Sequence, residues 1–116
     1  MFSLAPSDNR KENCDAGQVE QCLSAMRNQD LKALEELYRR TSASVFGYAL
    51  SVLKNVQDAE DVMHDLYVLV WSAVWKYSPD GKPMAWIITI TRNLCLQKLR
   101  EYQKRSDIPE EDWETY

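Results

Sequence analysis

Helix-breaking residues are scarce in the middle of this chain, and most of them gather at one place. Residues 18–104 contain two glycines and two prolines. Gly47 is isolated from the other three, which all fall within 78–83, a segment that reads Ser-Pro-Asp-Gly-Lys-Pro. Long stretches without proline or glycine favour helices over many short strands, because both residues destabilise a helix interior. The sequence therefore predicts long helices and one strong loop at 78–83, where Pro79 suits a turn and Gly81 a positive φ angle.

Apolar side chains recur at steps of three and four residues, the spacing of one helix face, in four segments. They predict a short helix over 18–27 and three long helices over about 30–54, 58–77 and 83–104. The fold class expected is therefore all-α: a compact bundle of three long helices plus a short N-terminal helix.

Caps and apolar stripes define these helices further. Asp30 is expected to cap the second helix, Asn55 to end it, Asp58 to open the third, and Pro83 to lie in the first turn of the fourth. The first helix should bury Val19, Cys22, Leu23 and Met26. The second should bury Leu31, Leu34, Tyr38, Val45, Tyr48 or Ala49, and Val52. The third should bury Val62, Leu66, Val70 and Val74, flanked by Met63, Tyr67 and Trp71. The fourth should bury Met84, Ile87, Ile88, Ile90, Thr91, Leu94, Cys95, Leu99 and Tyr102.

The two ends of the chain differ from its middle. Residues 1–16 are polar and aperiodic and predict a flexible N-terminus, 17–105 form the folded domain, and 106–116 read as an acidic linker. The start lacks a signal-peptide pattern, and no apolar run approaches the roughly 20 residues needed to cross a bilayer. We expect a cytoplasmic protein that makes no membrane contact.

The three cysteines, Cys14, Cys22 and Cys95, are an odd number at no familiar spacing. In a reducing cytosol they are expected to be free thiols. A zinc site from Cys14, Cys22 and His64 is the alternative, although no paired metal-ligand motif is present. One histidine beside an acid supplies neither a nucleophile nor an organised base. We therefore expect no enzyme activity, no metal, no cofactor and no small-molecule substrate.

Charge is unevenly distributed along the chain, whose net charge is −4. Residues 92–105 hold five basic side chains and one acid, whereas 107–116 hold five acids and no base. A basic segment beside an acidic tail is compatible with a DNA-facing patch that the net charge conceals. The fourth helix should present on its polar face Trp86, Thr89, Arg92, Asn93, Gln97, Arg100 and Lys104.

Three motifs follow one another in a defined order. Residues 58–61 read Asp-Ala-Glu-Asp and lead into an apolar helix that contains Trp71. The loop 78–83 comes next. The last motif is Ala-Trp-Ile at 85–87, followed by Thr-Arg-Asn-Leu at 91–94 and a terminal Leu-Arg pair.

In this order and spacing, the motifs resemble region 2 of the extracytoplasmic-function (ECF) sigma factors, over about residues 31–105. Two positions depart from the family pattern. His64-Asp65 replaces a glutamine-glutamate pair, and Gln97 replaces an aspartate that usually follows the asparagine by four residues. The family's second domain, a helix-turn-helix, is missing, so we expect a fragment that ends in the interdomain linker.

The resemblance implies that the third helix docks against the clamp helices of the largest subunit of core RNA polymerase. An acidic rim beside an apolar body would suit basic helices. The residues expected in this interface are Asp58, Glu60, Asp61, Asp65, Leu66 and Tyr67, with Val70 in the apolar body. For Asp58 and Asp61, compensation of the helix dipole on a solvated face is the alternative.

The resemblance also implies that the loop and the fourth helix bind the non-template strand of the −10 promoter element. Aromatic rings stack on unpaired bases, and cations neutralise phosphates. The residues expected to do so are Ser78, Asp80, Lys82, Trp86, Arg92, Asn93, Arg100 and Lys104. Alternatively, Trp86 packs in the core, Asn93 bonds between helices, and the loop is a connector.

The function implied is that of a sigma factor domain that binds core polymerase and recognises and melts the −10 element, with an anti-sigma factor as a further partner. A helical protein-interaction module, such as an anti-sigma factor or adaptor, would explain the acidic surface but not the motif order. A generic DNA-binding regulator should show a helix-turn-helix pattern, and none is apparent.

Overall fold

The described part of the chain forms helices joined by short connections. The computed structural model describes residues 16–79 and 81–106, with side chains to residue 104. Its helices are α2 (Ala16–Arg27), α3 (Leu31–Leu53), α4 (Val56–Ala73) and α5 (Pro83–Ser106), and a 3₁₀ turn, η1 (Val74–Lys76), follows α4. Within these ranges there is no strand, which confirms the predicted all-α class. The predicted flexible start and acidic linker lie outside the described residues, except for Ala16 and Ser106, which belong to α2 and α5.

Side-chain caps set the helix boundaries. Asp30 caps α3 as predicted, since its carboxylate accepts a hydrogen bond of 3.0 Å from the backbone N–H two residues later. Lys54 ends α3 in a left-handed conformation (φ 57°). Asn55 does not end α3 but caps α4, because its side-chain oxygen accepts a 2.9 Å bond from the N–H of Asp58. The third helix was predicted to start at Asp58, but it starts two residues earlier, at Val56. The Asn55 side chain makes this possible because it accepts a hydrogen bond from one of the first backbone N–H groups, which have no partner within the helix.

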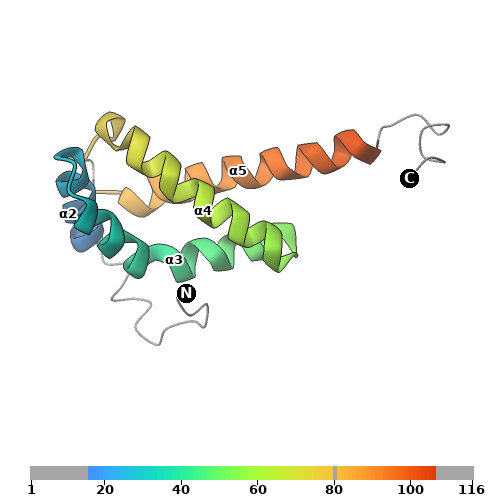
Figure 1. Cartoon of the computed structure of the whole chain (residues 1–116), viewed down its shortest axis with the longest axis horizontal. Coiled ribbons are helices and arrows are strands. Elements are labelled where there is room, and N and C mark those ends of the chain that lie inside the picture. The colour runs from blue at the N-terminus through green and yellow to red at the C-terminus, as the bar shows by residue number, and fades with distance from the viewer. Residues whose placement is uncertain (1–15, 80, 107–116) are drawn as a thin grey trace.

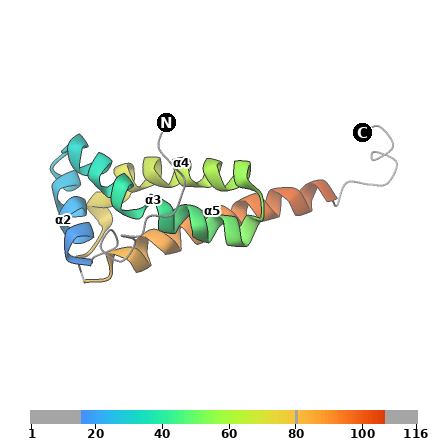
Figure 2. The same cartoon turned by 90° about the horizontal axis from the view of Figure 1, so that it is seen from below.

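The loop between α4 and α5 has the predicted chemistry. Gly81 has a φ of 81°, the positive value that favours glycine, and Pro83 is the first residue of α5. Figures 1 and 2 show that this loop, η1 and α2 lie at the same end of the molecule.

The core occupies the space between α3 and the other helices. Its larger cluster joins all four helices and includes Val19, Leu23, Met26, Leu37, Val45, Met63, Leu66, Val70 and Ile87. A smaller cluster surrounds Cys95 toward the other end of α3 and contains Ala49, Leu53, Ala59 and Val62. The face predicted for the first helix is confirmed, because α2 buries all four of the expected residues.

The buried face of α3 agrees with the predicted stripe only at Val45 and Ala49. Leu31 is 65% exposed, and Leu34, Tyr38 and Val52 are only partly buried. The buried residues form a face that is rotated about the helix axis relative to the predicted one. They are Ala33, Leu37, Thr41, Ser42, Val45, Ala49 and Leu53. This face includes small and hydroxyl side chains, which an apolar pattern does not mark.

A buried polar contact joins α3 to α4. The hydroxyl of Thr41 donates to the carbonyl oxygen of Leu37 (2.8 Å) and also contacts the hydroxyl of Tyr67. Because the Thr41 proton is already donated, the Tyr67 hydroxyl acts as the donor to Thr41. The Tyr67 ring lies 4.8 Å from the Tyr38 ring, measured between centroids. This contact turns Tyr67 and its neighbour Leu66 toward the core.

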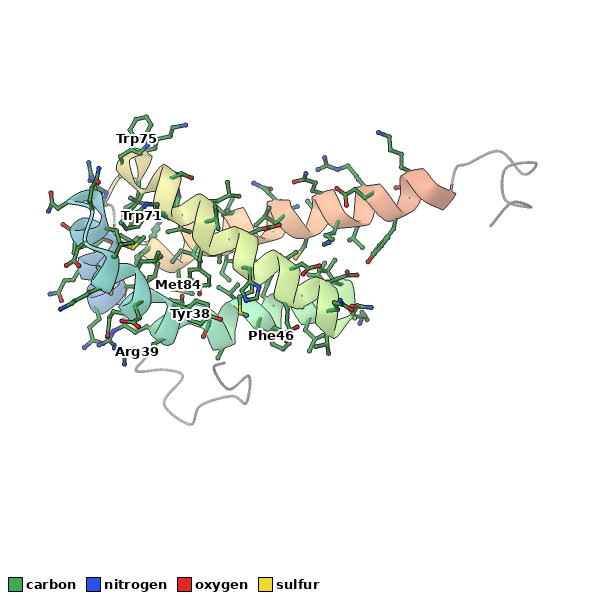
Figure 3. The ribbon with its side chains drawn as sticks, viewed as in Figure 1. Tyr38, Arg39, Phe46, Trp71, Trp75 and Met84 are labelled. Carbon is green, nitrogen blue, oxygen red and sulfur yellow. The ribbon has the colours of Figure 1, made fainter. Side chains whose placement is uncertain are left out.

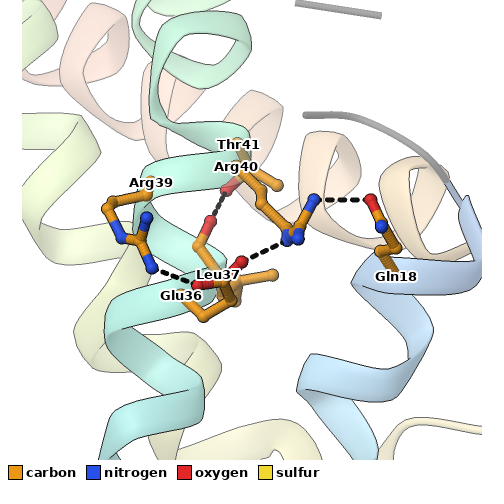
Figure 4. Close-up of polar contacts among 6 residues, drawn as sticks. All are labelled: Gln18, Glu36, Leu37, Arg39, Arg40 and Thr41. Atoms are coloured by element: carbon orange, nitrogen blue, oxygen red, sulfur yellow. Dashed lines mark hydrogen bonds and ion pairs between the residues drawn. The ribbon is translucent and has the colours of Figure 1, made fainter. Parts of the chain in front are cut away.

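Polar side chains hold α2 against α3 at the surface. The guanidinium of Arg40 donates to the side-chain oxygen of Gln18 and forms an ion pair with Glu36 (Figure 4). Arg39 contacts the same carboxylate from the other side. Partly exposed pairs of this kind contribute little stability individually, about 0–1 kcal/mol each. Both ion pairs lie within α3, and the pair with Arg40 positions its guanidinium for the hydrogen bond to Gln18 of α2. The apolar face of α2 supplies the stability of its packing.

The C-terminal part of α5 extends beyond the other helices (Figures 1 and 2). Ile87, Thr91 and Cys95 are buried at four-residue steps, whereas Leu99 and Tyr102 are exposed. The apolar face predicted for the fourth helix is thus confirmed at these three buried residues and wrong at Leu99 and Tyr102, where α5 has passed most of the bundle. Its other members, Met84, Ile88, Ile90 and Leu94, are only partly buried. No helix in the described ranges is long and apolar enough to span a membrane.

The burial of α4 can be tested with a matched pair of truncations. Leu66→Ala should lower the free energy of unfolding by about 2–5 kcal/mol, because it removes a fully buried side chain. Val68→Ala should change it by no more than about 0.5 kcal/mol, because Val68 is 69% exposed. Urea denaturation followed by circular dichroism measures both. Equal losses for the two variants would contradict this orientation of α4.

Candidate functional site

The predicted polymerase-binding residues separate into open and buried groups. Asp61 and Asp65 are exposed, and Glu60 is half-buried. The prediction that Leu66, Tyr67 and Val70 form an apolar docking surface is wrong, because all three are buried in the contact of α4 with the core. Their hydrophobicity serves folding, so any partner must use the opposite side of the helix.

The side of α4 that points away from the core carries apolar residues that the sequence analysis missed. Val68 is 69% exposed and Leu69 is 41% exposed. Trp75, in η1, is 64% exposed and projects away from the bundle, with the Lys76 ammonium 5.3 Å from its ring centroid (Figure 3). The exposed residues on this side of the helix are Asp61, His64, Asp65, Val68, Leu69 and Ser72, and we call this surface the α4 outer face.

The sequence did contain an indication of this exposed apolar surface. Residues 66–71 are all apolar or aromatic, so this part of the helix has no polar face. A helix that is apolar all round has more hydrophobic surface than one core contact can bury. On the α4 outer face, the acidic residues Asp61 and Asp65 lie one to two helical turns before the apolar residues Val68 and Leu69.

The first turns of α4 are also tied to α5. The Lys98 ammonium lies 3.5 Å from a carboxylate oxygen of Asp61 and 4.0 Å from one of Asp58. The Tyr102 hydroxyl contacts the Asp58 carboxylate as well. Asp58, whose side chain is only 14% exposed, therefore links α4 to α5, whereas Asp61 and Asp65 remain open to solvent.

The polar face predicted for the fourth helix is largely present. All of its expected members except Trp86 are exposed on α5, and together they form what we call the α5 outer face: Thr89, Arg92, Asn93, Gln97, Arg100 and Lys104. Within the part of the chain that the structure describes, Arg92, Arg100 and Lys104 form no ion pair. The alternative considered for Asn93, a bond between helices, is not seen among the described residues, and its side chain is exposed.

A cleft of about 400 Å³ lies where the loop meets the start of α5, and we call it the loop cleft. Its lining residues are Lys76, Tyr77, Ser78, Lys82, Ala85, Trp86 and Thr89. Ser78 and Lys82, both predicted to bind DNA, are thus brought together with Trp86, whereas Asp80 lies outside the described residues. The cleft combines two ammonium groups with aromatic surface.

Trp86 belongs both to the core and to this cleft. It is half-buried, packs against the larger core cluster, and its ring lies 4.9 Å from the ring of Tyr77, tilted by 50°. Its remaining surface lines the loop cleft. The two interpretations of Trp86 are therefore both partly correct, because a large ring at the edge of the bundle can pack on one side and stay open on the other.

The two cysteines in the described ranges are buried and belong to no cluster of metal ligands there. Cys22 and Cys95 are free and buried, and Cys14 lies outside the described residues. Burial raises the pKa of both thiols, and the nearby Glu36 carboxylate raises that of Cys22 further. Cys22 faces the core while His64 is exposed on α4, so these two ligands of the alternative zinc site do not converge. No cluster of three or more potential metal ligands occurs among the described residues.

Comparison with known proteins gives consistent matches. The family described as Sigma-70 region 2 matches residues 37–105. The "ECF RNA polymerase sigma factor SigK" of Mycobacterium sp. (strain KMS) is 31% identical over 85 residues, which cover 72% of this chain and 44% of that protein. The protein of the same name from Mycolicibacterium vanbaalenii is 26% identical over 90 residues, covering 77% and 46%. The chain thus spans less than half the length of these relatives. No solved structure gives a significant match.

The raised pKa values predict how the thiols respond to pH. In a Cys14→Ser variant, Cys22 and Cys95 should react with a thiol reagent at pH 8 far more slowly than in the urea-unfolded chain, because burial disfavours the thiolate. Stability should fall as the pH rises above about 8.5, since the unfolded chain then loses thiol protons that the folded chain retains. Reaction at the unfolded rate in native buffer would show that the thiols are accessible.

Proposed function

The chain belongs to the sigma-70 region 2 family, and on that premise we propose that it binds core RNA polymerase and helps to recognise and melt the −10 promoter element in transcription initiation. The observation that carries this proposal is the family match over residues 37–105, which spans α4, α5 and most of α3. The relatives named as ECF sigma factors support the subfamily that the three motifs indicated. The match favours this function over an adaptor or a generic DNA-binding regulator. We propose that the chain acts by binding rather than by catalysis, and in the cytoplasm.

The α4 outer face is the proposed contact with the polymerase. Asp65 supplies open negative charge, and Asp61 adds a carboxylate that is exposed but paired with Lys98. Val68 and Leu69 supply apolar area beside them. This combination suits basic helices such as those expected in the clamp of the largest subunit, because charge guides association while apolar area supplies affinity. An anti-sigma factor that blocks the polymerase would need to cover the same face.

The loop cleft and the α5 outer face form the proposed path of the unpaired promoter strand. Trp86 offers part of its ring for stacking at one end, with Lys76 and Lys82 beside it. Arg92, Arg100 and Lys104 follow along the helix, and the distance from Trp86 to Lys104 is about 27 Å at 1.5 Å per residue. With few cations on this path, binding of the isolated chain should be weak and sensitive to salt.

The docking face can be tested by a charge reversal combined with loss of apolar area. The double variant Asp65→Lys and Val68→Ser should reduce co-purification with core polymerase by at least tenfold, because it changes both parts of the α4 outer face. A matched control exists on α3, where Glu35→Lys with Leu31→Ser makes the same changes at exposed positions. Both variants should keep the melting temperature nearly unchanged. Retention of the α4 variant on the polymerase, at the level of the control, would exclude this face.

The strand path can be tested by the salt dependence of binding. Each phosphate contact contributes about 0.7 to the slope of log K against log salt for a single strand. Arg92→Ala with Arg100→Ala should therefore lower the slope by about 1.4 units in a fluorescence titration with a single-stranded −10 oligonucleotide. Lys32→Ala with Lys54→Ala removes the same charge from exposed positions elsewhere and should leave the slope unchanged. Equal slopes for the two double variants would argue against the α5 outer face.

A further inference from the structure

The part of α5 that extends beyond the other helices (Figures 1 and 2) carries two pairs of polar side chains on opposite sides. Lys98 and Tyr102 are four residues apart and therefore share one face of the helix. Arg100 and Lys104 share another face for the same reason. The two pairs are two residues out of step, which places them about 160° apart around the helix axis. We call residues 98–104 the α5 arm.

The side of the α5 arm that carries Lys98 and Tyr102 is held by the carboxylate of Asp58, on α4. One oxygen of this carboxylate lies 4.0 Å from the Lys98 ammonium. The other oxygen accepts a hydrogen bond from the Tyr102 hydroxyl. Lys98 also lies 3.5 Å from the carboxylate of Asp61, one turn further along α4. Both oxygens of Asp58 are therefore engaged by α5.

The position of Asp58 is itself fixed by the cap of α4. The Asn55 side chain accepts a 2.9 Å hydrogen bond from the backbone N–H of Asp58, which places this residue in the first turn of the helix. Apolar packing does not take over its role in holding the arm. Cys95 is the last buried residue of α5 among the side chains that the structure describes, and Leu99 is exposed. The α5 arm is consequently positioned by polar contacts with the start of α4.

The opposite side of the α5 arm faces solvent. Arg100 and Lys104 are exposed there and belong to the α5 outer face, along which the promoter strand is proposed to run. Cations on an unordered stretch of chain would lose conformational freedom when they bind phosphates. A segment that is held in its bound form beforehand avoids much of that cost. Contacts on one side of the arm therefore favour binding on the other side.

We propose that Asp58 is a positioning residue for binding of the promoter strand. Its contacts with Lys98 and Tyr102 hold the α5 arm, and the arm then presents its two outer cations in line with the rest of the α5 outer face. This inference rests on the proposed function, because that function supplies the phosphates. The role differs from contact with the polymerase and from compensation of the helix dipole, since neither of those involves Tyr102.

The test removes the contact from either side. Asp58→Ala removes the carboxylate from α4, whereas Tyr102→Phe removes only the hydroxyl from α5 and leaves the start of α4 intact. In the full chain, both variants should weaken binding to a single-stranded −10 oligonucleotide and lower its salt slope, by up to about 1.4 units, the contribution of two phosphates. The double variant should lose no more than Asp58→Ala alone, because both changes break the same contact.

The sign of the effect separates positioning from simple charge. Loss of an acid ordinarily strengthens binding to a polyanion, whereas the positioning role predicts weaker binding for Asp58→Ala. Glu35→Ala removes the same charge from an exposed position on α3 and should leave binding unchanged or slightly stronger. Tyr48→Phe removes a tyrosine hydroxyl from α3 and should have no effect. If Asp58 only stabilised the start of α4, the melting temperature would fall in Asp58→Ala while Tyr102→Phe bound the strand normally.

The carbon chemical shifts of residues 99–104 measure whether the α5 arm is helical without DNA. They should move toward random-coil values in Asp58→Ala and Tyr102→Phe, while co-purification with core polymerase stays at the wild-type level. Unchanged shifts, an unchanged salt slope in both variants, or stronger strand binding by Asp58→Ala would each overturn the positioning role. Failure of the wild-type chain to bind any oligonucleotide would instead overturn the proposed function, and the shifts would still decide whether Asp58 holds the arm.

Discussion

The contact between the buried hydroxyls of Thr41 and Tyr67 is compatible with one orientation of α4, and both surfaces of that helix go with this orientation. Successive residues in a helix differ by 100°, so a shift of one position would break the contact and move the acidic residues Asp61 and Asp65 toward the core. Burying unpaired carboxylates is strongly unfavourable. The same orientation therefore supplies Leu66 to the core and leaves Val68 outside for a partner.

Tyr77 has a comparable role at the end of the bundle where α2 meets the loop. Its ring packs beside Trp86, its hydroxyl donates to Glu20, and its backbone oxygen accepts from Arg27. Tyr77 consequently lines both the loop cleft and a second cleft of about 280 Å³ between the loop and α2.

Much of the fold was predictable from local chemistry, since a cap such as Asp30 and a turn residue such as Gly81 act within a few positions of the chain. The α5 outer face was predictable for the same reason, because polar residues at helical spacing indicate a solvated side. The buried side of α3 was not, because Thr41 becomes suitable for the core only when Tyr67 provides a partner 26 residues away. The contact of Glu20 with Tyr77 was missed for a similar reason, because Tyr77 lies 57 residues later.

The length of α5 beyond Cys95 has a consequence for how binding energy is used. Its last two to three turns lack tertiary packing, apart from the contacts of Lys98 and Tyr102 with α4, and short helical segments in water are only marginally stable by themselves. Amide protons in this stretch should therefore exchange with solvent faster than those around Ile87, because local opening there does not require the core to unfold. Arg100 and Lys104 lie on this segment. If Arg100 and Lys104 bind phosphates as proposed, part of the electrostatic free energy of those contacts is used to hold this end of the helix in its helical form.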